Sequence, residues 1–138
     1  MLYLQQDDGD AHKLAKAALD YAEAAIDAED ALVEGHLQAA ISLAQRGSRM
    51  GAMRAFVLGI AGRARDELDM ALLREPENPW ALSSSAAWNL EVSRRAGEGR
   101  FGSDPQVGYA QFMLARRLDP ENLLIAYECA LRLLAYDK

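Results

Sequence analysis

The sequence is poor in cysteine and histidine, and this shortage excludes several kinds of site. The one cysteine, Cys129, has no second cysteine with which to form an intrachain disulfide. The two histidines, His12 and His36, lie far from each other and from Cys129, without the paired spacings of zinc sites. We therefore expect no metal site and no cofactor, and a core that is held together by apolar packing.

Long apolar stretches are also missing. No run of about 18 apolar residues occurs, so we expect no membrane insertion. The first ten residues lack the basic start and the apolar run of a signal peptide. We expect a cytoplasmic protein, or a periplasmic one if an export signal has been removed.

Positive charge is scarce as well. The chain has 15 lysines and arginines against 21 aspartates and glutamates, for a net charge of −6. In the first third, only Lys13 and Lys16 offset nine acidic residues between positions 7 and 34. Proteins that contact phosphate backbones need a basic face, so we expect no nucleic-acid partner.

Alanine, by contrast, is abundant, and it is the best helix former. Apolar residues recur at helical spacing in six segments, and no segment alternates with the period of a strand. The six predicted helices cover residues 10–27, 31–46, 52–74, 80–95, 105–118 and 123–136. We therefore predict an all-α domain over residues 10–138, preceded by a flexible lead-in over residues 1–9.

The spacing of apolar residues also predicts an apolar face on each helix. In the first helix, this face comprises Leu14, Ala18, Tyr21, Ala22 and Ala25. In the third helix, it contains Ile60, Ala64, Leu68 and Ala71, and in the fifth it contains Val107, Ala110, Leu114 and Leu118. The last helix has two apolar rows, one with Leu124, Tyr127, Leu131 and Leu134, and the other with Ile125, Cys129 and Leu133.

One pattern occurs twice along the chain. Residues 71–82 and 115–126 both contain an alanine, three further residues, an acid and then Pro-Glu-Asn before a new helix. Pro76 and Pro120 are therefore 44 residues apart, and residues 24–32 hold a weaker copy without the proline. We expect Asn78 to cap the fourth helix, with Pro79 at its first position.

This pattern resembles the tetratricopeptide repeat and, more loosely, divergent bacterial repeat proteins. The family's period is about 34 residues, and here the extra length lies in the loop over residues 97–103. The resemblance implies an α-solenoid of antiparallel helical hairpins with about six helices, because one hairpin cannot bury its own apolar face. The family's small positions are matched by Ala64, Ala71, Ala86 and Ala115. Its large position in the second helix of a pair is matched by Leu68 and Phe112.

The resemblance also implies a function in binding. We expect a non-catalytic interaction module or scaffold that binds a protein or peptide on a concave face formed by the second, fourth and sixth helices. The partner-binding candidates are His36, Trp80, Ser84, Trp88 and Tyr127. The alternative is a small-molecule-binding component, linked to transport, with an apolar pocket between these helices. The apolar ends of such a stack also allow a homodimer, and Leu2, Tyr3 and Leu4 are candidates to cover one end.

The loop over residues 97–102 spells G-x-G-x-x-G, but it follows a helix and no strand is predicted, so it is no dinucleotide site. A smaller hypothesis is an anion site at the start of the fifth helix, formed with Arg94, Arg95 and Arg100. Residues 103–106 fit a capping box for that helix. No nucleophile, base and orienting group are recognisable, so we expect no catalytic residues and no enzyme.

Overall fold

The structure, a computed structural model, describes residues 8–28, 33–49 and 59–137, and it confirms the all-α prediction. The described helices are α1 (Asp8–Ala28), α2 (Val33–Ser48), α4 (Ile60–Arg74), α5 (Pro79–Ala96), α6 (Pro105–Leu118) and α7 (Leu123–Tyr136), with a short 3₁₀ turn η2 (Arg100–Gly102) before α6. No strand occurs in these three ranges. Leu2, Tyr3 and Leu4, and the first part of the predicted third helix, lie outside the described residues.

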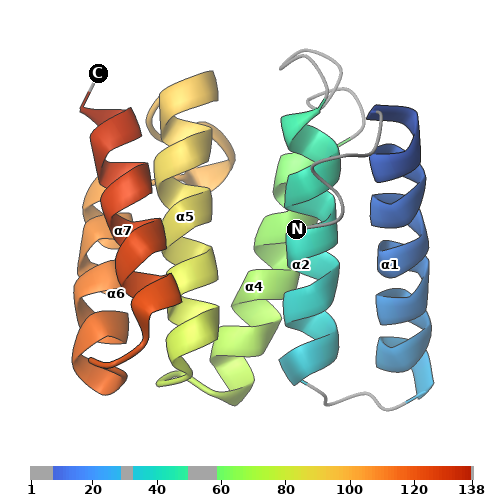
Figure 1. The fold of residues 1–138 in the computed structure, drawn as a ribbon, viewed down its shortest axis with the longest axis horizontal. Coiled ribbons are helices and arrows are strands. Elements are labelled where there is room, and N and C mark those ends of the chain that lie inside the picture. Colours follow the sequence, from blue (N-terminus) through green and yellow to red (C-terminus); the bar gives the residue numbers. More distant parts are fainter. Residues whose placement is uncertain (1–7, 29–32, 50–58, 138) are drawn as a thin grey trace.

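Successive helices run in opposite directions and follow one another along a staggered row, in which α4 lies partly behind α2 and α6 lies behind α7 (Figure 1). The helix α2 packs against α1 and α4, and α5 packs against α4, α6 and α7. At one end of the row α1 packs mainly on α2, and at the other end α7 packs on α5 and α6. Because of this order, α1 and α7 each have a side that no described helix covers.

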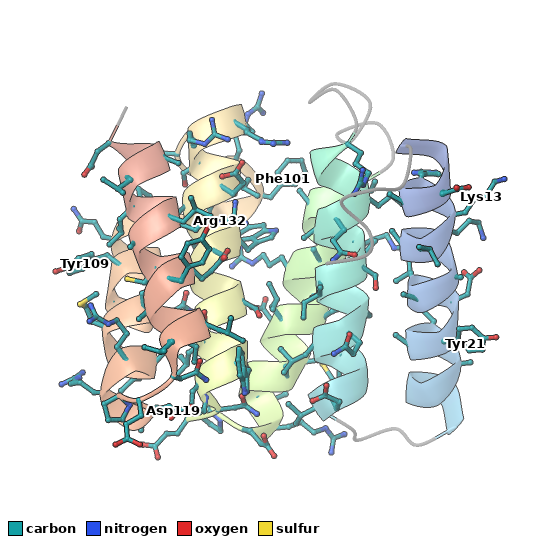
Figure 2. The ribbon with its side chains drawn as sticks, in the orientation of Figure 1. Lys13, Tyr21, Phe101, Tyr109, Asp119 and Arg132 are labelled. Atoms are coloured by element: carbon teal, nitrogen blue, oxygen red, sulfur yellow. The ribbon has the colours of Figure 1, made fainter. Side chains whose placement is uncertain are left out.

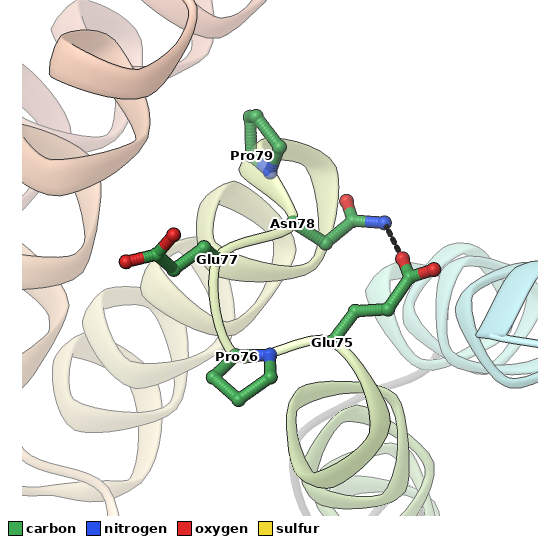
Figure 3. A pocket seen from close by; sticks show the side chains of 5 residues that line it. All are labelled: Glu75, Pro76, Glu77, Asn78 and Pro79. Carbon is green, nitrogen blue, oxygen red and sulfur yellow. Dashed lines mark hydrogen bonds between the residues drawn. The ribbon is translucent and has the colours of Figure 1, made fainter.

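The Glu-Pro-Glu-Asn-Pro segment forms the predicted turn between α4 and α5. The side-chain oxygen of Asn78 accepts hydrogen bonds from the backbone N–H groups of Trp80, at 2.9 Å, and Ala81, at 3.1 Å. Its amide nitrogen donates to Oε2 of Glu75 at 2.6 Å, as Figure 3 shows. Pro79 occupies the first turn of the helix, where its missing N–H leaves no hydrogen bond unmade.

The same turn recurs between α6 and α7. Asn122 caps α7 by accepting from the N–H of Ile125 at 3.1 Å, and it donates to Oδ2 of Asp119 at 2.9 Å. The repeated sequence pattern thus builds one local structure twice. As a result, α5 and α7 start in equivalent ways and run in the same direction along the row.

The core lies between the helices in three clusters of buried side chains. The predicted face of the third helix is confirmed, since Ile60, Ala64, Leu68 and Ala71 are all buried in the cluster between α2 and α4. Phe112 of α6 is fully buried and packs with Ala86, Leu90 and Cys129. The third cluster joins Leu82, Ala115 and Ile125.

In two helices, the predicted apolar face is not the face that is buried. In α1, Leu14 and Tyr21 are exposed, and the buried row is Ala11, Ala15, Leu19 and Ala22. In α6, Val107 and Leu118 are exposed, and the buried row is Gly108, Phe112 and Ala115. Both helices carry apolar residues on several sides, and each packs with a row that contains glycine or alanine, because small residues let two helices approach more closely.

The helices within the described ranges do not meet the requirements for a membrane span, since none is both long and apolar enough to cross a bilayer.

Candidate functional site

The side of α7 that faces away from α5 and α6 is apolar and exposed to solvent. We call it the outer face of α7, and it comprises Leu123 (81% exposed), Leu124 (68%), Tyr127 (66%), Leu131 (43%), Leu134 (65%) and the exposed Ala130. Leu124, Tyr127, Leu131 and Leu134 follow one another at steps of three, four and three residues, so they form one stripe along the helix. The sequence identified this row as one of the two apolar rows of the last helix, and no described helix packs on it.

The inner side of α7 fixes the helix to the rest of the domain. Ile125 and Cys129 are buried against α5 and α6. On the side toward α5, Arg132 donates to Oε1 of Glu128 at 2.6 Å and to Oε2 of Glu91 at 3.4 Å. In Figure 2, Arg132 lies between α7 and α5. The charged groups of α7 therefore lie beside the outer face, and the face itself carries no charge.

Glu91 of α5 is the centre of a small ionic cluster. Its Oε1 accepts from Nη2 of Arg94 at 2.5 Å and from Nε of Arg95 at 2.7 Å. Partial burial raises the pKa of Glu91, but the hydrogen bond from Arg94 and the charges of Arg94, Arg95 and Arg132 outweigh it and lower this pKa below its usual value. Glu91 therefore stays ionised and links α5 to α7.

The predicted anion site, with Arg94, Arg95 and Arg100 around the first N–H groups of α6, is not formed in the structure. Arg94 and Arg95 pair with Glu91, and Arg100 is exposed in η2. The carboxylate of Asp104 caps α6 by accepting from the N–H groups of two residues in its first turn, at 2.8 and 3.3 Å. This carboxylate fills the position that an anion would take, and its charge repels one. The predicted capping box is wrong, because Asp104 is the N-cap and Ser103 is buried.

The five predicted partner-binding residues do not form one surface. His36 is buried, and its Nδ1 lies 2.6 Å from Oε2 of Glu67, which joins α2 to α4. Trp88 is buried too, and its indole N–H donates to the carbonyl oxygen of Ala61 at 2.9 Å. Both residues therefore have structural contacts inside the domain.

The other three candidates are accessible to different degrees. Trp80 is 47% exposed at the start of α5, Ser84 is half-buried on the same helix, and Tyr127 belongs to the outer face of α7. The structure thus leaves Trp80 and Tyr127 as the large side chains among the candidates that a partner can reach.

A polar groove of about 230 Å³ lies between α4, α5, α6 and the loop before α6. At its base, Asn89 donates to Oε1 of Gln111 at 3.0 Å and to the carbonyl oxygen of Ser85 at 3.1 Å, and it accepts from the N–H of Asp104 at 3.0 Å. Gln111 in turn donates to the hydroxyl of Ser85 at 3.0 Å. Because these groups satisfy one another, the network anchors the loop to α5 and leaves few groups for a ligand. Sequence reasoning overlooked it, since an isolated glutamine carries no motif.

A second hollow, of about 650 Å³, is formed by the five consecutive residues of the turn between α4 and α5, Glu75–Pro79 (Figure 3). It is larger than the polar groove, but it is open, and no side chains from separate elements converge on it. Neither hollow lies between α2, α5 and α7, where the sequence predicted an apolar pocket as the alternative function.

The structure also shows where the side chains that could bind a metal or act as a nucleophile lie. In the described part of the chain, no three side chains of histidine, cysteine, aspartate or glutamate are grouped to hold a metal ion. Cys129 is buried, and burial raises the pKa of its thiol, although Arg116 opposes this effect. A buried thiol with a raised pKa forms little thiolate, so Cys129 is a core residue of low reactivity.

Comparison of the chain with protein-family models, with curated proteins and with solved structures gives no match. Function is therefore inferred from the geometry of the chain itself, and chiefly from the outer face of α7.

Proposed function

We propose that this chain is a non-catalytic protein-binding module, built from helical hairpins that resemble tetratricopeptide repeats, and that the outer face of α7 binds an amphipathic helix of a protein partner. The observation that carries the proposal is the row of Leu124, Tyr127, Leu131 and Leu134, which is uncharged, largely apolar and exposed. Soluble proteins keep contiguous apolar patches small, and a larger one marks an interaction site.

The spacing of the row favours a helical partner. Steps of three and four residues are those of the a and d positions in helix pairs, where each side chain fits between residues of the facing helix. A partner strand would need an exposed sheet edge, and the surface of α7 offers only side chains, because its backbone groups are bonded within the helix. A partner helix with leucine, isoleucine or alanine at i, i+3, i+4 and i+7 therefore fits best.

The energy available from this face is similar in size to the cost of association. The exposed fractions of the five large residues amount to about three whole side chains. Covering them contributes roughly 5–9 kcal/mol at about 1.5–3 kcal/mol per side chain. Association costs about 4–15 kcal/mol in lost motional freedom. A partner must therefore add rim contacts, and Trp80, on the neighbouring helix α5, is the second contact that we propose.

A library of displayed amphipathic helices tests this function. Binders selected on the parent protein should bind the Tyr127→Glu variant at least tenfold more weakly, since a charge in the face would have to be buried without a partner. Leu73→Glu is the matched control, because Leu73 is 74% exposed on α4, away from this face. Trp80→Ala tests the second contact. Binders that hold Tyr127→Glu and the parent equally well would contradict the proposal.

A further inference from the structure

A second uncovered surface lies on α1, at the opposite end of the row from α7. This surface carries a residue pattern that packs on a neighbouring helix elsewhere in the domain. In the fully described helices, a triplet with glycine or alanine at positions i and i+7 and a large apolar residue at i+4 occurs four times. The four triplets are Ala15–Leu19–Ala22, Ala17–Tyr21–Ala24, Ala64–Leu68–Ala71 and Gly108–Phe112–Ala115.

Three of these triplets are buried, and each packs on a neighbouring helix. The α6 triplet shows the mode most clearly, because Phe112 packs with Ala86 and Leu90 of α5. The backbones come so close that a Cβ atom on Gly108 would lie 3.0 Å from the carbonyl oxygen of Ala86. The α4 triplet lies in one cluster with the buried row of α2, and the α1 triplet centred on Leu19 joins the same cluster. In this protein the triplet is therefore a contact surface for another helix.

The fourth triplet, Ala17–Tyr21–Ala24, has no such neighbour among the described helices. All three residues are exposed, and Tyr21 is 80% exposed. Figure 2 shows the Tyr21 side chain pointing away from the row of helices. The helix α1 thus carries two triplets, one packed on α2 and one turned to solvent, with Leu14 beside it at 52% exposure.

The helix α7 has an uncovered position of the kind on which such a triplet packs. The repeated turn makes α7 the counterpart of α5, with each residue of α5 matching the one 44 positions later. In α5, Ala86 and Leu90 are buried under the α6 triplet. Their counterparts in α7 are Ala130 and Leu134, which are exposed in the outer face. Ala130 and Leu134 of the outer face therefore hold the positions that a triplet-bearing helix covers elsewhere in the chain.

We propose that two copies of this chain associate end to end, with the outer face of α7 in one copy packed on the Ala17–Tyr21–Ala24 triplet of α1 in the next. This inference rests on the proposed function and names a second copy as the source of the helix. The helix α7 runs parallel to α2, and α1 runs antiparallel to α2. If two copies stack in the same orientation, α7 of one copy therefore lies antiparallel to α1 of the next, as α5 lies antiparallel to α6 within one copy. The contact continues the interface between α5 and α6 across two molecules.

The contact joins two different surfaces, so each added copy leaves one α1 and one α7 uncovered. Such a heterologous contact does not close into a dimer, and it lets the assembly grow with concentration. The exposed large residues of the α7 face amount to only about three whole side chains, so we expect weak association, with an average mass that rises steadily with protein concentration.

Sedimentation velocity on two single-face variants tests the inference. Tyr127→Glu blocks the α7 face and keeps α1, and Tyr21→Glu blocks the triplet and keeps α7. Each variant alone should stay monomeric, and an equimolar mixture should form a complex of two chains that grows no further. Leu73→Glu, the matched charge control, should associate like the parent. The pair Leu134→Arg and Ala17→Arg repeats the test with the opposite charge, and circular dichroism checks that each variant is folded.

Three results would overturn the inference. They are a parent protein that is monomeric at every concentration, a Tyr21→Glu variant that associates like the parent, and a mixture that forms no two-chain complex. The second result would mean that two α7 faces pair with each other. If the inference fails while library helices still bind the parent at least tenfold better than Tyr127→Glu, the proposed function stands and its partner is another protein.

Discussion

Replacing Phe112 with alanine should destabilise the domain more than any change on the surface of the same helix. Its side chain is fully buried between α5, α6 and α7, where it packs with Leu90 and Cys129. Truncation of a buried phenylalanine costs about 3–5 kcal/mol, because the lost contacts are not replaced and a cavity remains. This is a large share of the roughly 5–15 kcal/mol by which small domains are stable. The half-exposed Tyr109 on α6 is the matched control, and its replacement by alanine should change stability by less than about 0.5 kcal/mol.

Urea unfolding, followed by circular dichroism at equal protein concentrations, measures both changes. The Phe112→Ala variant should unfold at a lower urea concentration with a similar slope, since the surface exposed on unfolding changes little. A loss below about 1 kcal/mol would mean that this cluster does not hold α6 and α7 to α5, and it would refute the packing described here.

Three further changes test separate parts of the structure. Asn78→Ala should cost about 1 kcal/mol in urea unfolding, because the cap of α5 is lost, and an equal stability would contradict the turn geometry. Gly102→Ala should lower the melting temperature, because Gly102 has a φ of +79° and a Cβ atom there would overlap the Arg65 guanidinium, which lies over the Trp88 ring. Glu91→Gln should remove a pH-dependent part of the stability. Because the pKa of Glu91 is lowered in the folded protein, its carboxylate stabilises the fold at pH values above 4.5, the usual pKa of the group. This contribution is lost as the pH falls through the lowered pKa of the folded state. Acid unfolding curves of the parent and Glu91→Gln should therefore converge at low pH, and a constant difference would contradict the assignment.

The helices and turns could be predicted from the sequence because their signals are local. Helical spacing of apolar residues located the elements, and the Pro-Glu-Asn segments predicted two turns whose asparagine caps are present in the structure. The buried rows of α1 and α6 were missed because both helices are apolar on more than one side. Which row is buried depends on how closely another helix approaches. The small residues Gly108 and Ala15 permit a close approach, but the sequence does not show which helix approaches them.

The candidate site was only partly predictable, for a similar reason. Tyr127 was identified from its position on the last helix, and it lies in the outer face of α7. His36 and Trp88 were candidates because of their positions on the helices of the predicted concave face, but each has a hydrogen-bond partner on another helix that sequence spacing does not reveal. Which of the two apolar rows of α7 is exposed was not predicted, because spacing places Leu124 and Leu134 on one row without showing which row packs on other helices.

Thiol labelling at Ala130 tests most directly whether the outer face of α7 is open to solvent and binds a helix. Ala130→Cys places a small reactive group in this face, and peptide mapping separates it from the buried Cys129. We predict that residue 130 is alkylated rapidly in dilute protein, and at least tenfold more slowly when a selected helical peptide is bound. Labelling as slow as that of Cys129 in dilute protein, or a rate that the bound peptide leaves unchanged, would contradict the account.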